Sequence, residues 1–260
     1  MNLLPFGKLP PAKPRKFVPE EIDLGYWPQI APLFDELEKR ALQIQNPADL
    51  EKWLFDWSEL NAALDEESSR RYIAMTCHTD NSDAEKAYLH FVENVEPQLK
   101  PRQFALEKIY AAHPQREKLS RERFFIFDRD VKNHVELFRP ENVPLETEEA
   151  KLSQQYQKLT GALTVKFRGD EKTLVQMGRY LEEPDRALRQ EAWELVAKRR
   201  LQEAEKFDDI FDAQIKVRQQ IAKNAGFENY RDYAYRRLGR LDYTPDDCKK
   251  FHDATEKEIM

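Results

Sequence analysis

The sequence predicts a mainly α-helical protein with one small β-hairpin near residues 162–174. Only 7 of its 260 residues are glycine, while 35% are charged and 40% are hydrophobic, which is typical of amphipathic helices. Apolar residues recur at spacings of three and four through most of the chain. The alternation that indicates a strand is clear in one stretch, so we expect helices to dominate.

Residues 1–26 are predicted to form an irregular N-terminal arm. Seven prolines lie within the first 32 residues, and each proline fixes φ and lacks an amide hydrogen. We therefore expect an extended strap or a loose tail, with regular structure beginning near Trp27.

Apolar stripes then predict a series of helices. The first runs from Pro28 to about Gln45. Asn46 can cap a second helix that has Pro47 at its first position and ends near Leu64. Further helices are expected over residues 67–78, within 79–95, over 97–112 and over 146–158.

Residues 121–145 give a mixed signal. The aromatic run "RFFIF" is followed by Pro140 and Pro144, so a short helix or strand is expected, followed by an irregular connection.

The predicted hairpin lies in "ALTVKFRGDEKTL". Leu163, Val165 and Phe167 alternate with polar residues, and Gly169-Asp170 supplies the turn. The tripeptide "RGD" is interpreted as part of this turn.

A long helical pattern runs from Asp185 to about Ala225, with one break near Glu205. Arg189, Trp193 and Arg200 share one face of it. An arginine stem covering the tryptophan is one interpretation, and a guanidinium in need of a carboxylate partner is another. Arg218 should also need such a partner.

The Tyr- and Arg-rich segment "AGFENYRDYAYRRLG" is interpreted as a helical junction. Gly226 can end one helix in the left-handed conformation, with Phe227 folding back on the last turn. Asn229 and Asp232 can cap the next helix. On that helix Tyr230, Ala234 and Leu238 are expected to point inward, with Tyr233 and Arg237 to the side.

The last element opens with "TPDD", in which Thr244 and Asp247 can form a capping box. It continues to Met260 without a stop signal. We expect the chain to end within a helix, which is a first indication of a longer protein.

Composition and charge exclude several classes. Cys77 and Cys248 are too few for a disulfide framework, which favours a reducing, cytoplasmic setting. No apolar run approaches the ~20 residues that span a bilayer, so no membrane partner is expected. The net charge of -6 makes nucleic acid an improbable partner.

No catalytic or metal-binding motif is evident. The five histidines are at least 12 positions apart, so H-E-x-x-H is absent. His252 and Glu256, four residues apart, could be metal ligands but are better explained as solvated neighbours. His78 beside Cys77 indicates a buried helix end more than a catalytic dyad, and no glycine-rich phosphate loop occurs.

Several of these features occur in an order that resembles a known family. The hairpin is followed by "DRALRQEAW", then by "KVRQQIAKNAGF", then by the Tyr-rich segment. This order resembles the N-terminal half of oligoendopeptidase F-like zinc metallopeptidases, which are relatives of thimet oligopeptidase. The resemblance covers this sequence from about Pro5 to Met260. The motif positions that carry the resemblance are Asp185, Arg186, Arg189, Arg218, Gly226, Phe227 and Tyr230.

The resemblance implies a fold of helical lobes enclosing a channel that admits short peptides. It implies a Pro-rich arm (1–26), an N-terminal helical lobe (27–145) and the start of the helical peptidase domain (146–260), truncated before the zinc motif. The chain would supply channel wall and scaffold, and the C-terminal catalytic half would hold zinc. No catalytic or metal residue carries over, so this chain alone should bind no zinc and hydrolyse nothing.

Two other functions are open at this point. A free-standing helical module could bind a peptide or protein through an aromatic-lined groove. The Tyr/Arg segment could stack on single-stranded RNA, although the acidic net charge disfavours this.

Overall fold

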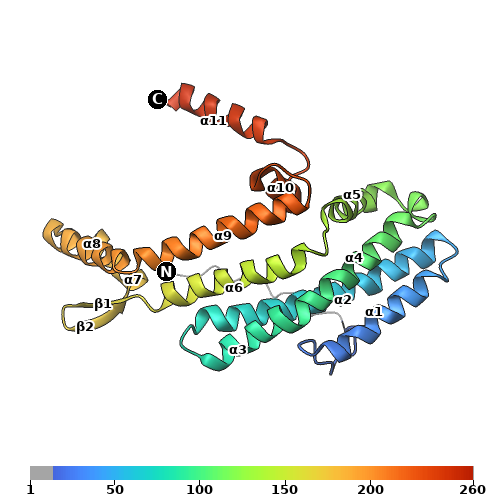
Figure 1. Cartoon of the computed structure of the whole chain (residues 1–260), viewed down its shortest axis with the longest axis horizontal. Coiled ribbons are helices and arrows are strands. Elements are labelled where there is room, and N and C mark those ends of the chain that lie inside the picture. The colour runs from blue at the N-terminus through green and yellow to red at the C-terminus, as the bar shows by residue number, and fades with distance from the viewer. Residues whose placement is uncertain (1–13, 260) are drawn as a thin grey trace.

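The computed structural model describes residues 14–259, and α-helices dominate it as predicted (Figure 1). In chain order its helices and strands are α1 (Trp27–Ala41), α2 (Pro47–Cys77), α3 (Ser82–His90), α4 (Glu96–Ala112), α5 (Arg121–Leu137), α6 (Asn142–Gly161), β1 (Thr164–Phe167), β2 (Asp170–Thr173), α7 (Leu174–Met177), α8 (Arg186–Leu201), α9 (Ala204–Asn224), α10 (Tyr230–Arg237) and α11 (Pro245–Ile259). A π-helical turn (Phe91–Val95) joins α3 to α4, and 3₁₀ turns occupy Arg116–Lys118 and Gly178–Glu182. None of the described helices combines the length and apolarity needed to cross a membrane.

The largest apolar core lies between α1, α2 and α4. Phe34 and Leu37 from α1 pack with Trp53 from α2 and Leu106 from α4, all fully buried. The Trp53 indole Nε1 donates a hydrogen bond to the Leu37 carbonyl at 2.8 Å, which satisfies the one polar atom that this side chain buries.

The expected break between two helices near residues 64–67 is wrong, because α2 is one continuous helix. Residues 65–69, "DEESS", contain neither glycine nor proline, so nothing in the backbone stops the helix. Ion pairs between residues four apart support the helix at and just after the expected break, Glu66–Arg70 at 2.6 Å and Glu67–Arg71 at 2.7 Å.

Of the two alternatives at residues 121–145, the helix is correct, although it is longer than expected, and the strand is wrong. α5 spans 17 residues, and its aromatic run is held in helical form by packing. The Phe127 ring lies 5.1 Å from the ring of Tyr110 on α4 and 5.8 Å from that of Trp57 on α2. Tertiary contact thus overrides a weak local preference for strand.

Helix α6 begins at Asn142, four residues earlier than expected. Pro144 is its third residue, where the backbone amide has no partner within the helix, so proline costs nothing there. Only a few residues therefore connect α5 to α6, instead of a long irregular segment.

The β-hairpin is confirmed, with Thr164 opposite Thr173 and Phe167 opposite Asp170. Its turn is Arg168-Gly169, one residue earlier than predicted. Both turn residues have positive φ, 52° and 93°, as a tight hairpin turn requires. Phe167 is buried against residues of α7 and α8.

The predicted break in the long C-terminal helix is confirmed, since α8 ends at Leu201 and α9 begins at Ala204. α9 runs antiparallel to α6 and packs along it (Figure 1). Beyond α10, α11 extends away from the other helices. Its predicted capping box is present, with the Thr244 amide 3.0 Å from the Asp247 carboxylate.

The junction between α9 and α10 forms as expected at Gly226, whose φ is 86°. The Phe227 amide donates to the Ala222 carbonyl at 2.9 Å, which closes the end of α9. The expected inward face of α10 is wrong, however. Tyr233 is the buried residue, and Leu238 is 54% exposed at the end of the helix.

The N-terminal arm is tied to α2 mainly by the Glu59 carboxylate, with a longer contact from Arg15 to Glu66 at 3.4 Å. Of this arm, residues 1–13 lie outside the described part, and residues 14–26 are irregular, as expected. Glu59 on α2 accepts hydrogen bonds from the backbone amides of Lys16, Phe17 and Val18 at 2.7–3.0 Å. Burial alone would raise the pKa of Glu59, but these amides and the charge of Arg15 lower it below 4.5.

We expect Glu59→Gln to lower the free energy of unfolding by about 1–3 kcal/mol, because the arm loses hydrogen bonds to a charged acceptor. The pKa of Glu59 is lower in the folded state than in the unfolded state. The extra stability of the wild type over Glu59→Gln is therefore complete above the unfolded-state pKa, and it is lost as the pH falls through the folded-state pKa. Urea unfolding between pH 7 and pH 3 measures it.

Asp65→Asn, on an exposed position of the same helix, is the matched control and should change stability little. An equal loss in both variants, or a Glu59→Gln effect that persists unchanged at pH 3, would contradict the account of this contact.

Candidate functional site

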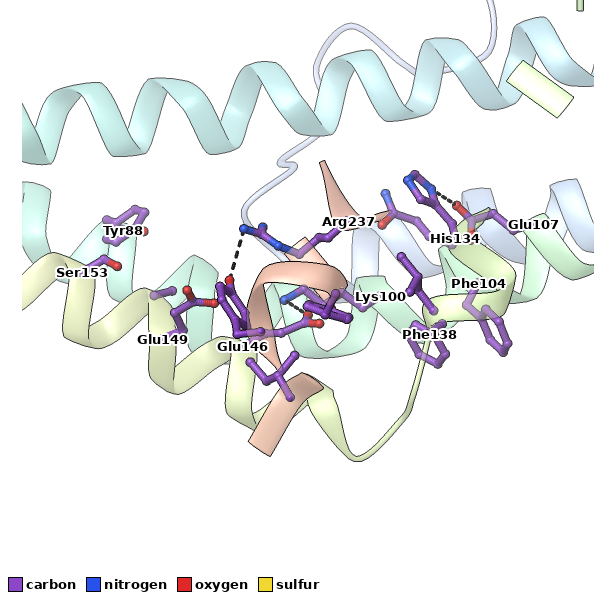
Figure 2. A pocket seen from close by; sticks show the side chains of 16 residues that line it. Tyr88, Lys100, Phe104, Glu107, His134, Phe138, Glu146, Glu149, Ser153 and Arg237 are labelled. Atoms are coloured by element: carbon purple, nitrogen blue, oxygen red, sulfur yellow. Dashed lines mark hydrogen bonds and ion pairs between the residues drawn. The ribbon is translucent and has the colours of Figure 1, made fainter. Parts of the chain in front are cut away.

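A cavity of about 550 Å³ lies where α4, α5 and α6 meet α9 and α10 (Figure 2). Charged side chains from four helices face it. They are Lys100 and Glu107 on α4, His134 on α5, Glu146 and Glu149 on α6, and Arg237 on α10. Its volume falls in the range of small-molecule and cofactor sites.

Lys100 and Glu146 form the central ion pair of the cavity, with 2.7 Å between Nζ and the carboxylate. Behind them, Glu96 lies 3.8 Å from Lys100. Burial raises the pKa of Glu96, and the nearby Glu146 carboxylate raises it further. One lysine thus lies within 4 Å of two carboxylates, of which Glu146 lines the cavity.

His134 and Glu107 form a second pair, with Nδ1 and Oε1 3.1 Å apart (Figure 2). The hydrogen bond to Glu107 raises the pKa of His134, and burial only partly opposes this. The imidazole therefore carries more positive charge near neutral pH than a free histidine would.

Glu149 is paired with Arg218 of α9 at 2.6 Å, and this pair joins α6 to α9. The Arg218 guanidinium also lies 5.6 Å from the centre of the Tyr230 ring. The expectation that Arg218 needs a carboxylate partner is confirmed.

Buried amides reinforce the same helix pair. The Asn142 side chain donates to the Ile221 carbonyl at 3.1 Å and accepts from Asn224 at 2.7 Å. Asn142 is only 2% exposed, so its hydrogen bonds form away from water.

Aromatic side chains line the rest of the cavity. The rings of Phe104 and Phe138 stack at 4.1 Å. Tyr88 and Tyr233 are 9% and 4% exposed, and burial raises the pKa of each to about 12. Both hydroxyls therefore stay protonated at neutral pH and can donate hydrogen bonds.

A larger and more apolar hollow of about 1280 Å³ lies at the hairpin end of α6 and α9. Tyr156 and Phe207, whose rings are 5.7 Å apart, form part of its lining. Ser153 lines both hollows and accepts a hydrogen bond from Gln214 of α9 at 3.2 Å. The α6–α9 pair thus contributes to two neighbouring hollows.

The motif residues inferred from sequence fall into two groups. Arg218, Gly226, Phe227 and Tyr230 come together at the α9–α10 junction, and Tyr230 lines the cavity.

Asp185, Arg186 and Arg189 lie apart from the cavity, at the start of α8. Asp185 caps that helix through the Ala187 and Leu188 amides, and Arg186 is exposed. The carboxylate partner considered for Arg189 is wrong. Its guanidinium donates to the carbonyls of Glu183 and Pro184 at 2.7 and 2.9 Å, which fixes the turn before the helix.

Zinc does not fit the residues described. Within residues 14–259, no three His, Cys, Asp or Glu side chains converge as metal ligands. His252 and Glu256 are exposed neighbours on α11. Cys77 and His78 do lie at the end of α2, but the expectation that this end is buried is wrong, because both residues are exposed. No catalytic step can be assigned to a metal on these residues.

The charged residues of the cavity were not identified from the sequence as site residues. One signal was available, since Glu146, Glu149 and Ser153 are spaced to share one face of the predicted helix over residues 146–158. Their partners Lys100 and Arg218 lie far away in sequence, and only the fold brings them together.

Comparison with known proteins gives a consistent result. Residues 23–138 match the Peptidase M3 N-terminal domain, and residues 179–260 match Peptidase family M3. A comparison with curated protein sequences gives no significant match.

Solved structures resemble almost the whole chain. PZ peptidase A with an inhibitor is 27% identical with a TM-score of 0.86, over 94% of this chain and 43% of that one. A protein provisionally named oligoendopeptidase F, solved at 3.1 Å, is 25% identical with the same TM-score and coverage. A protein from Bacillus anthracis str. Ames that carries the same provisional name is 21% identical, with a TM-score of 0.86. The match covers 92% of this chain and 44% of that one, and it shows the fold alone. This chain thus spans less than half the length of these proteins.

We expect the Arg218–Glu149 pair to contribute about 1 kcal/mol of coupling energy, because both side chains are largely buried between α6 and α9. The variants Arg218→Gln and Glu149→Gln and their combination form a double-mutant cycle, measured by urea unfolding.

The exposed pair Lys249–Asp253 on α11 serves as the control cycle and should give only ~0.3–0.5 kcal/mol. A coupling energy for Arg218–Glu149 no larger than that of the control would show that the pair does not hold the two helices together.

Proposed function

This chain belongs to the M3 family of peptidases as an oligoendopeptidase F-like member, and we propose that it is the N-terminal part of a zinc-dependent oligopeptidase that hydrolyses short peptides. The observation that carries the proposal is how much of this chain matches part of a longer peptidase. Nearly all of the chain, 94%, superposes on 43% of an inhibitor-bound PZ peptidase A, and two M3 family matches lie along it in order.

In this proposal the chain supplies one wall of the peptide channel and the helical base of the enzyme. The α6–α9 pair, with its two neighbouring hollows, is the part of the wall best suited to contact a peptide. The pair contributes the Glu149 carboxylate to one hollow and the Tyr156 and Phe207 rings to the other, which suits a ligand with both polar backbone and apolar side chains. Residues 1–26 would be an arm, 27–145 an N-terminal lobe and 146–260 the start of the peptidase domain.

Zinc and the catalytic base would come from a C-terminal catalytic half, because the residues described here offer no set of metal ligands. When bound there, zinc would polarise the scissile carbonyl and activate water. This chain's own residues would bind and orient the peptide, and we expect the whole enzyme to work in the cytoplasm.

The test begins with the codons that follow Met260 in the gene. We expect them to encode H-E-x-x-H on a helix. The complete product should cleave a quenched fluorescent oligopeptide, lose activity with a chelator and regain it with zinc. The 260-residue chain should be inactive and should bind no stoichiometric zinc in elemental analysis.

Two results would overturn the proposal. One is a complete reading frame without H-E-x-x-H. The other is chelator-sensitive cleavage by residues 1–260 alone. A stable monomer that binds peptides but has no continuation in the gene would favour the helical binding module instead.

A further inference from the structure

Within residues 14–259, the cavity of Figure 2 holds one cation, Arg237, without a carboxylate partner. Lys100 is paired with Glu146, and Glu149 is paired with Arg218. In contrast, the only hydrogen bond of the Arg237 guanidinium within residues 14–259 is to the Tyr230 hydroxyl at 3.4 Å, drawn as a dashed line in Figure 2.

Two tyrosine hydroxyls face the same cavity and form no hydrogen bond within the described part of the chain. They belong to Tyr88 and Tyr233, which are both more than nine-tenths buried. Both hydroxyl oxygens remain accessible from the cavity, so each can donate a hydrogen bond to a ligand there. Burial and the Glu146 carboxylate raise the pKa of Tyr233, and the positive charge of Arg237 opposes this rise.

The remaining wall is apolar. Phe104 and Phe138 stack there, and Leu137 and Ile221 complete the surface beside them. The cavity therefore offers a guanidinium, hydroxyl donors and an apolar wall, which match a carboxylate attached to an apolar group.

We propose that this cavity binds the carboxylate of a short peptide, with Arg237 as its ion-pair partner, Tyr233 as a hydrogen-bond donor and the Phe104–Phe138 wall against the adjoining apolar side chain. The choice of a peptide rests on the proposed function. A carboxylate fits better than a phosphate, because Glu146 and Glu149 lie on the same cavity and would repel a doubly charged anion more strongly.

The binding site is tested by calorimetry on the 260-residue chain. The probes are N-acetyl-dialanyl-phenylalanine with a free carboxylate, its C-terminal amide, and an amide of the same length that carries one internal glutamate. We expect the free acid to bind at least ~10-fold more tightly than the neutral amide, the size expected for one charge-assisted contact. If the glutamate peptide binds as tightly as the free acid, the cavity accepts a side-chain carboxylate as well as a C-terminal one.

Arg237→Gln should weaken binding of the free acid roughly 10- to 100-fold and leave the neutral amide unchanged. Arg237 is exposed and forms no ion pair, so the fold should survive this change. Tyr233→Phe removes only the hydroxyl and should weaken binding of the free acid a few-fold. Arg231→Gln, on the same helix but outside the cavity, is the matched control and should bind like the wild type.

Equal binding of acid and amide, no binding of either, or wild-type affinity in Arg237→Gln would each overturn this site. Zinc-dependent hydrolysis by the complete gene product is measured separately. If the complete product hydrolyses peptides but calorimetry shows no preference for the free carboxylate, the binding site is disproved and the proposed function still holds.

Discussion

The antiparallel packing of α6 against α9 is the contact on which the rest of the arrangement depends. It is the most extensive contact between helices in the described chain, and its polar links are Asn142 to Ile221 and Asn224, Glu149 to Arg218, and Ser153 to Gln214. Helix α4 and the end of α5 form one side of the cavity, and α10 forms the other. Because α6 and α9 connect these sides, their spacing sets the width of the cavity.

Much of the fold could be predicted from sequence because local rules act within one element. The glycine at residue 226, the capping box at Thr244 and the alternation before the hairpin each fix a helix end or a strand without distant partners. The failures lie elsewhere. Packing on Tyr110 and Trp57 decides the conformation of α5, and a missing stop signal decides the length of α2. The packing of α5 is not visible in a short window of sequence, whereas the absence of glycine and proline from residues 65–69 is.

The cavity was harder to predict for the same reason. The residues of the α9–α10 junction were found because they form one continuous motif, and Tyr230 among them lines the cavity. The ion pairs were not found, since Lys100 and Glu146 are 46 positions apart and Glu149 and Arg218 are 69 apart. Tyr233 and Arg237 were assigned to the side of α10, and only the position of α10 against α5 and α9 turns them toward the cavity.

The most direct measurement is an experimental structure of the complete gene product with an uncleaved short peptide bound. Our account predicts that the peptide contacts side chains of α6 or α10 and that zinc is held entirely by residues outside 14–259. A peptide that touches none of the described residues, or a zinc ion held by any of them, would contradict the role of this chain as channel wall and scaffold.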